Sequence, residues 1–387
     1  MSDRRAVIVA TARTAIGRAH KGSLVDVRPD DLAAFAIRAA LDQVPELPPD
    51  SIDDVVVGCG FPERKQGMNL GRRVALLAGL PDSVPGTTVN RFCASSLQAI
   101  RIAFHAIRAG EGRAFVAAGV ESISQVNGYP RDDDAHPRLR GGDDAVANAY
   151  VPMGITAENV AARYGVSRED MDRYAQQSHE RALAARRTGF FEREITPYVM
   201  PDGTVVTTDD GPRPTSSLET LAALKPAFLD HGKVTAGNAC PLNDGAAAVI
   251  VMDEEFAGSH GIRPRARILS SAVSGVAPEL MGIGPIGAVA KALAITGMTT
   301  ADVEVMELNE AFAAQVLPVC AELGCDPFSD RVNPNGGAIA LGHPFGMTGA
   351  RIMATLINDL ETLDREIGLE TMCVGGGQGM AMIVQRA

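Results

Sequence analysis

Hydrophobic positions in the first third of the chain alternate between two patterns, short apolar runs and apolar residues spaced three or four apart. The runs, typical of buried strands, cover residues 4–11, 52–58 (where a helix end leads into the run) and 114–121. The spaced pattern, typical of amphipathic helices, covers residues 31–41 and 69–78. This alternation predicts a mostly parallel β-sheet with helices on its faces.

The last third of the chain repeats this order of elements. Strand-like and helix-like segments follow one another at residues 265–269, 286–295, 301–307, 337–360 and 371–375. A further strand closes each half, at residues 246–252 and 380–385. A chance echo of ordinary strand–helix alternation is the alternative, but the shared order argues against it. We therefore expect two similar α/β halves packed face to face.

Residues 122–235 have no counterpart in the second half. Residues 127–144 are polar and rich in Asp, Gly and Pro, which predicts a loop. Two helices are predicted after it, at residues 157–164 and 168–187, and Ser167 is placed to cap the second. A long inserted segment is usually functional, so we expect it to cover a site that the halves build. The predicted halves are residues 1–262, which include the insertion, and residues 263–387.

Charge and composition exclude some classes of protein. The net charge of −11 argues against a nucleic-acid binder, although a local arginine cluster could still receive an anionic substrate. No apolar run reaches the length of a membrane span, and the first residues lack the apolar segment of a secretory signal. The six cysteines include no CxxC pair, which favours reduced thiols and a cytoplasmic location. Cys320 and Cys325 are close, but no nearby residue completes a metal set.

Cys93 lies where a β-prone run gives way to a helix. The run ends at Asn90, and the helix stripe that follows consists of Leu97, Ile100, Phe104 and Ile107, with Gly110 placed to end the helix. The positive end of a helix dipole favours a thiolate and lowers a cysteine pKa. A buried structural cysteine fits this stretch equally well.

Two glycine-rich segments in the second half carry further chemistry. His343 stands between Gly342 and Pro344, which predicts a tight turn that presents the imidazole to a cavity. Cys373 ends a strand before a turn whose free backbone N–H groups can bind an oxyanion. A backbone-bonded histidine and a buried cysteine are the alternatives. If the turns of both halves face one cleft, Cys93 gains an activating histidine and a second thiol for acid–base work.

In their order and spacing, the motifs of this chain resemble those of the thiolases along nearly its whole length. The matching stretches are residues 90–99, 153–159, 235–238, 243–247, 309–312, 333–346 and 373–379. The resemblance implies a layered αβαβα arrangement of two similar halves with an inserted loop domain. It also implies no tightly bound cofactor, with coenzyme A as co-substrate.

The resemblance assigns five catalytic positions. Cys93 would carry the acyl group and His343 would activate it. Cys373 would protonate the departing acetyl-CoA carbanion and then deprotonate the incoming coenzyme A. Asn309 would hold a water that forms one oxyanion hole with His343. The backbone N–H groups of Cys93 and Gly375 would form the other.

The resemblance also assigns coenzyme A contacts to the inserted region and its surroundings. The pantetheine contacts would be Met153, Phe228, Met281 and Phe312, although such residues also fill ordinary cores. Arg213 would lie near the nucleotide, with a solvated loop charge as the alternative. Cys240 stands where many relatives have a serine, and Met347 departs from the usual Cys or Ala in a way that could reshape the acyl pocket.

The segment at residues 151–156, with Pro152 in place of a histidine, resembles degradative 3-oxoacyl-CoA thiolases. The alternatives are a biosynthetic acetoacetyl-CoA thiolase, a carrier-protein-dependent condensing enzyme and a catalytically silent acyl-CoA-binding protein. The condensing enzymes need two histidines, where this chain has Asn309 and Cys373. The resemblance further implies a homodimer or homotetramer and leaves room for a β-oxidation hydratase/dehydrogenase partner.

Overall fold

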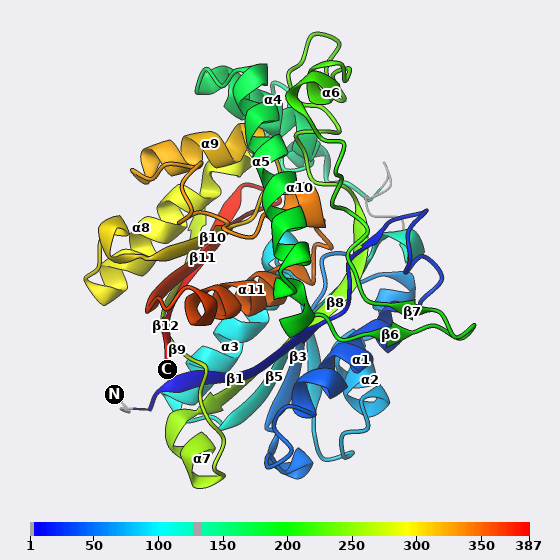
Figure 1. Cartoon of the computed structure of the whole chain (residues 1–387), viewed down its shortest axis with the longest axis vertical. Helices are drawn as coiled ribbons and strands as arrows, with labels where there is room; N and C mark the ends of the chain where they lie inside the picture. Colours follow the sequence, from blue (N-terminus) through cyan, green and yellow to red (C-terminus); the bar gives the residue numbers. More distant parts are fainter. Residues whose placement is uncertain (1–3, 127–133) are drawn as a thin grey trace.

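The N-terminal half is a sheet covered by helices (Figure 1). The computed structural model describes residues 4–126 and 134–387. The strands of this half are β1 (Ala6–Arg13), β2 (Gly17–Arg18), β3 (Asp54–Gly58), β4 (Gly86–Val89), β5 (Ala114–Ser122) and β8 (Asn243–Asp253). Its helices are α1 (Pro29–Leu41), α2 (Leu70–Leu77), α3 (Ser95–Ala109) and α7 (Glu254–Ser259). The strands and helices predicted from the hydrophobic pattern are present here. The prediction of a mostly parallel sheet is wrong, because β8 pairs antiparallel with β1, β2 and β5, and only β3 pairs parallel, with β4 and β5.

The C-terminal half repeats the same construction. Its strands are β9 (Ala266–Gly275), β10 (Val305–Leu308), β11 (Ile367–Val374) and β12 (Gln378–Arg386). Its helices are α8 (Gly284–Thr296), α9 (Ala313–Glu322), α10 (Ala338–Leu341) and α11 (Thr348–Thr362). Residues 337–360 were predicted as a glycine-rich turn followed by a helix, and α11 is that helix. The short helix α10 before the turn that carries His343 was not predicted.

The strand order confirms two similar halves. The first half runs β1-β8-β5-β3-β4 and the second runs β9-β12-β11-β10. In both, an antiparallel pair (β5 with β8, β11 with β12) is followed by a parallel pair (β5 with β3, β11 with β10). The two sheets are joined at one corner, where β1 and β9 share the pairs Val7–Arg267 and Ile8–Ala266. The halves therefore form one continuous ladder in addition to packing through their helices.

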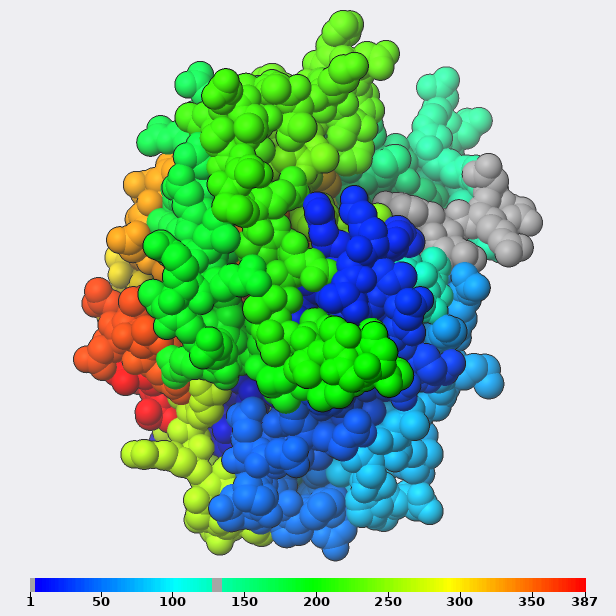
Figure 2. Space-filling view, turned by 45° about the vertical axis from the view of Figure 1, so that its right-hand side comes forward, coloured from blue at the N-terminus to red at the C-terminus, as the bar shows by residue number. Residues whose placement is uncertain are grey.

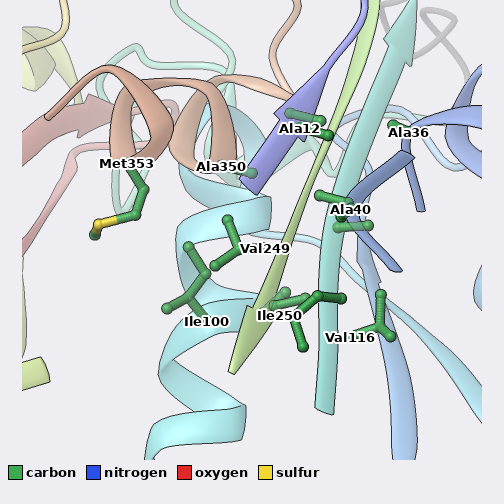
Figure 3. Packing of buried hydrophobic residues seen from close by; sticks show 14 of the residues in the cluster. Ala12, Ala36, Ala40, Ile100, Val116, Val249, Ile250, Ala350 and Met353 are labelled. Carbon is green, nitrogen blue, oxygen red and sulfur yellow. The ribbon is translucent and has the colours of Figure 1, made fainter. Parts of the chain in front are cut away.

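Helices α3 and α11 form the layer between the halves. Gly349 of α11 approaches α3 so closely that a Cβ there would lie 2.4 Å from the Leu97 nitrogen. The Ser96 hydroxyl accepts a hydrogen bond from the Ala350 N–H at 2.9 Å. On the α3 side, the predicted apolar stripe is buried, and Figure 3 shows Ile100 beside Val249 of β8. Because each half sends one central helix into this layer, residues at the helix starts come close together.

The inserted region extends from one end of the molecule along its face to helix α1 of the first half (Figure 1). Its elements are α4 (Met153–Arg163), α5 (Arg168–Arg187), β6 (Tyr198–Val199), β7 (Val205–Val206) and α6 (Leu218–Ala222). As predicted, Ser167 caps α5 by accepting a hydrogen bond from the Asp170 N–H. Helix α5 packs against α9 and α10 of the second half, and Figure 2 shows the region (green) meeting the N-terminal segment (blue). Residues 127–133 of the predicted loop lie outside the described residues.

One helical stretch, Pro278–Thr296, is long and apolar enough to cross a membrane by length and composition alone. Helix α8 within it packs on β9 and β12. Its residues Ala288, Val289 and Ala292 are fully buried there. A core helix that covers a sheet passes the same test of length and composition, so this stretch is explained by the fold.

Candidate active site

Cys93 lies in the turn that joins β4 to α3. Residues Phe92–Ala94 form a single 3₁₀ turn, and the backbone of Phe92 has a φ of 43°, which a bulky residue rarely adopts. The Ser95 hydroxyl accepts a hydrogen bond from the Arg91 N–H (2.9 Å) and donates one to the Phe92 carbonyl (2.7 Å). These bonds hold a strained turn in one conformation, as is common at functional sites.

The environment of Cys93 corrects the expectation of a lowered pKa. Burial raises the pKa of the Cys93 thiol well above its ordinary value, and the neighbouring Cys373 and Cys240 raise it further. The hydrogen bond from the Gly375 backbone N–H acts in the opposite direction but is weaker. The helix dipole is a local effect, whereas desolvation comes from the whole fold. The thiol of Cys93 therefore needs a neighbouring base to become a nucleophile.

The turn between β11 and β12 brings Gly375 to Cys93. Gly376 and Gly377 have φ values of 76° and 82°, a left-handed conformation that favours glycine. Arg91 donates to the Gln378 side-chain carbonyl at 2.9 Å, and the Gln378 amide donates to the Gly375 carbonyl at 3.3 Å. This chain of bonds ties the Cys93 turn to the Gly375 turn, so the Gly375 N–H remains directed at the Cys93 sulfur.

Cys373 lies at the end of β11, two residues before Gly375, and is fully buried. Burial raises the pKa of the Cys373 thiol to about 11, while a hydrogen bond from Gln315 lowers it. The Gln315 Nε2 lies 2.8 Å from the Cys373 sulfur. The two sulfurs, Cys93 and Cys373, are close enough to influence each other's ionisation, as the sequence predicted.

The hydrogen bonds around His343 define its tautomer. The Thr348 hydroxyl donates its only proton to the Pro344 carbonyl at 2.8 Å. The His343 Nδ1 lies 2.6 Å from the same hydroxyl oxygen and must therefore donate to it. Nε2 then carries a lone pair, and the Asn309 amide nitrogen lies 3.3 Å from it. His343 is thus held as a base whose free nitrogen faces Asn309.

Burial keeps His343 neutral in the resting protein. Burial, together with the positive charge of Arg351, lowers the pKa of His343 to about 3. The ring packs edge-on against Phe345, with centroids 5.0 Å apart. Phe345 lines the same cavity as Cys93, so a ring in contact with the imidazole also borders the cavity beside the nucleophile. A neutral imidazole is the form that can accept a proton from a thiol.

A cavity of about 480 Å³ opens beside Cys93. Three rings form one wall, with Phe61 in edge-on contact with Phe92 (6.3 Å between centroids) and with Phe345 (5.7 Å). The other lining residues are Ala135, Arg140, Asn148, Ala149, Tyr150, Val151, Pro152, Met153, Gly375 and Gly376. The cavity is mainly apolar and receives a few polar groups from the inserted region, a composition typical of ligand sites.

The structure places the predicted coenzyme A contacts in different surroundings. Met153 lines the cavity, whereas Met281 is fully buried in the core. Phe228 is 42% exposed and packs edge-on against the buried Phe312, with centroids 6.1 Å apart. Cys240 lies near Cys93 and Cys373. The backbone N–H of Arg213 donates to His179 Nδ1 at 3.1 Å.

Met347 does not line the cavity. It is fully buried, and a Cβ at Gly245 of β8 would lie 2.7 Å from its sulfur, so the side chain packs against that strand. Phe345, two residues earlier, lines the cavity. Gln315 and Thr348 were not expected at the site from the sequence. Their only signal was spacing, because each follows a predicted catalytic residue by five or six positions.

Metal chemistry was not expected here. Across residues 4–126 and 134–387, no group of three or more His, Cys, Asp or Glu side chains is placed to hold a metal ion.

Comparisons with known proteins identify the family. Residues 6–255 match the family described as "Thiolase, N-terminal domain", and residues 262–386 match "Thiolase, C-terminal domain". The chain is 44% identical to the 3-ketoacyl-CoA thiolase of Bacillus subtilis, with 99% of each chain covered. It is 45% identical to the β-ketoadipyl-CoA thiolase of Pseudomonas putida, with 97% of each covered.

A solved structure agrees with these matches. The crystal structure of the Bacillus anthracis acetyl-CoA acetyltransferase superposes with a TM-score of 0.91 at 39% identity and covers 99% of both chains. The whole chain therefore has one known architecture, and it belongs to the thiolase family.

Proposed function

We propose that this chain is a thiolase that cleaves 3-oxoacyl-CoA with coenzyme A to acetyl-CoA and a shortened acyl-CoA. The chain is an acyltransferase by family, and full-length relatives at about 45% identity are named for 3-oxoacyl-CoA cleavage. One observation carries the mechanism. The sulfur of Cys93 receives the Gly375 N–H in a buried site that also holds a second thiol, Cys373.

The first half of the reaction makes an acyl-enzyme. His343 Nε2 takes the proton of Cys93, and the thiolate attacks the ketone carbon (C3) of the substrate. We assign the oxyanion that forms at C3 to the backbone N–H groups of Cys93 and Gly375, and a second oxyanion hole to His343 and a water held by Asn309. When the C2–C3 bond breaks, the electron pair goes to C2, and Cys373 gives its proton to that carbon. Acetyl-CoA leaves, and the remaining acyl group stays on Cys93 as a thioester.

The second half returns the enzyme to its starting state. The Cys373 thiolate takes the proton of an incoming coenzyme A thiol. The new thiolate attacks the thioester carbon, and Cys93 leaves as a thiolate that recovers its proton from His343. A thiolate is both a good nucleophile and a good leaving group, so the same sulfur serves both halves. Coenzyme A acts here as co-substrate.

Relatives at 44–45% identity that are named 3-ketoacyl-CoA thiolase support substrates longer than acetoacetyl-CoA. The cavity of about 480 Å³ would hold part of the pantetheine as well as the acyl chain, because Met153, a predicted pantetheine contact, lines it. Each methylene of the acyl chain that moves from water to an apolar wall stabilises the bound substrate by about 0.8 kcal/mol. This raises kcat/KM by up to about fourfold. We expect kcat/KM for 3-oxohexanoyl- and 3-oxooctanoyl-CoA to equal or exceed that for acetoacetyl-CoA in steady-state thiolysis. A sharp fall beyond four carbons would instead indicate the biosynthetic acetoacetyl-CoA thiolase.

A second candidate substrate class carries a carboxylate at the far end of the acyl chain. Arg140 contributes to the cavity wall, and several relatives at 42–45% identity are named β-ketoadipyl-CoA thiolase. Arg140 is exposed at the rim of the cavity, where a guanidinium can pair with a carboxylate through charge-assisted hydrogen bonds. Because water screens an exposed pair, its contribution is about 1 kcal/mol or less, at most about fivefold in kcat/KM.

The test compares 3-oxoadipyl-CoA with 3-oxohexanoyl-CoA, which has the same chain length without the carboxylate. If the carboxylate is recognised, Arg140→Ala lowers kcat/KM about threefold to fivefold for the first substrate and leaves it unchanged for the second. Arg138→Ala is the matched control, because Arg138 is also exposed on the same loop but does not line the cavity. Equal losses with both substrates would rule out this role for Arg140.

We also propose a homodimer or homotetramer in the cytoplasm. Strand β4 ends the ladder, and a free edge strand is a ready surface for pairing with another chain. Met68, Leu76 and Leu77 of the adjoining segment are 88%, 44% and 45% exposed, which supports a second copy covering this edge. All six cysteines are free thiols, which supports a reducing compartment. Light scattering on the purified chain tests the oligomer directly.

A further inference from the structure

Gln315 gives Cys373 a hydrogen-bond partner that no motif suggested. The residue lies in the first turn of α9, is 1% exposed, and holds its amide Nε2 2.8 Å from the Cys373 sulfur. We propose that Gln315 is a positioning residue that fixes Cys373 for proton transfer and stabilises its thiolate each time the proton leaves. This inference rests on the proposed thiolase reaction.

The amide of Gln315 is held with its N–H groups toward the sulfur. Its Oε1 is buried without a hydrogen-bond partner in the described part of the chain. A buried carbonyl left without a donor is unfavourable and calls for an explanation. This orientation is explained if the N–H is needed at the sulfur. An amide turned the other way would place its carbonyl oxygen, a hydrogen-bond acceptor, against a thiolate that is itself an acceptor.

The backbone around Gln315 restricts its movement. A Cβ at Gly282 would lie 2.6 Å from the Gln315 Cβ and 2.9 Å from Oε1, so only glycine leaves room for this side chain. The start of α9 is anchored by the Ala313 N–H, which donates to the Asn238 carbonyl at 2.9 Å. The Gln315 N–H donates to the Phe312 carbonyl at 3.1 Å. The amide is therefore presented from a rigid element.

The chemistry of Cys373 requires such a donor. Its thiol must give a proton to the C2 carbanion and exist as a buried thiolate until coenzyme A supplies another. Burial alone raises the pKa of Cys373, and the Gln315 bond opposes this rise. A primary amide suits the task because it donates to the thiolate but does not itself exchange protons with the substrate. Without the donor, the thiolate would form more rarely and proton transfer would slow.

The first experiment replaces the donor at nearly constant volume. Gln315→Met is expected to lower kcat for thiolysis by about tenfold to a hundredfold, the range of a hydrogen bond to a charged group, with KM within twofold. Val316→Ala is the matched control, because Val316 is the buried neighbour on the same helix turn and should lower stability without changing kcat. If Gln315→Met keeps kcat within twofold of the parent, the inference is wrong.

The second experiment follows Cys373 itself and does not depend on turnover. In the Cys93→Ser protein, the rate of iodoacetamide alkylation at Cys373 at pH 8 is followed by mass spectrometry with and without Gln315→Met. The rate is expected to fall at least tenfold, because the thiolate fraction falls tenfold for each unit of pKa increase. An unchanged rate overturns the inference.

Gly282→Ala offers an independent route if Gln315→Met does not fold. The added methyl displaces the Gln315 amide without altering it, so the alkylation rate of Cys373 should again fall. If the parent protein shows no thiolysis but the substitution still lowers the alkylation rate of Cys373, Gln315 is supported as the donor to the thiolate and the proposed function is rejected. Failure of the proposed function can therefore be told apart from failure of this inference.

Discussion

Alanine in place of Cys93 is expected to lower kcat for thiolysis by about 10⁴-fold or more, the scale seen when an essential nucleophile is removed. The reason is that no other group can form the thioester. Cys373 is fully buried, and its Gln315 bond directs its sulfur to proton transfer. Coenzyme A should still bind, because the methyl group of alanine leaves the cavity wall intact. Steady-state thiolysis and calorimetric titration with coenzyme A measure the two effects separately.

The parent protein should also show a covalent intermediate. After brief incubation with 3-oxoacyl-CoA in the absence of coenzyme A, mass spectrometry should find the acyl group on the peptide that contains Cys93. Cys325→Ala is the control, since Cys325 is half-buried, does not line the cavity, and its thiol donates to the Cys320 carbonyl at 3.5 Å. Its kcat should stay within twofold of the parent. Thiolysis that survives Cys93→Ala would favour a different nucleophile, and a parent that binds acyl-CoA without cleaving it would favour the silent binding protein.

Most of the fold was predictable because its elements have strong local signals. The stripe after Cys93 defines α3, and Gly110, with a φ of 84°, ends that helix where the sequence predicted. The junction between the sheets was not predictable. It depends on two residue pairs between β1 and β9, which lie some 260 positions apart, and no periodicity encodes such a pairing. The short helix α10 before the His343 turn was likewise not predicted, and the turn itself is held by a contact across the halves, from the His343 N–H to the Asn243 side-chain carbonyl.

The candidate site was predictable where reactive residue types stand at the ends of elements. Cys93, Cys373 and His343 all fit this description. Their supporting residues do not, because glutamine and threonine are common and acquire a role only through three-dimensional contact. The pKa of Cys93 could not be predicted from the sequence for the same reason. Its position before a helix suggested a lowered value, but the fold around it determines the desolvation that raises the value.

Buried charge is the other feature that the sequence left hidden, and it leads to a large expected effect on stability. Arg13 at the end of β1 donates to both Asp209 oxygens, at 2.7 and 3.0 Å, and to Glu194 at 2.9 Å. All three side chains are at most 3% exposed. Burial alone would lower the pKa of Arg13, but the carboxylates of Asp209 and Glu194 raise it above its ordinary value. The group thus ties β1 to the inserted region as a charged cluster.

Arg13→Ala is expected to lower the free energy of unfolding by about 3–5 kcal/mol, since removing one partner leaves buried carboxylates uncompensated. Arg13→Lys should recover only part of the loss, because an ammonium cannot bind Asp209 with two parallel bonds. Arg5→Ala is the matched control. Arg5 precedes the same strand and pairs with Glu254 at 3.3 Å, but its side chain is 51% exposed, so its removal should cost less than about 1 kcal/mol. Urea unfolding at pH 7 measures all three variants, and equal losses for Arg13→Ala and Arg5→Ala would show that the buried cluster contributes no more than a surface pair.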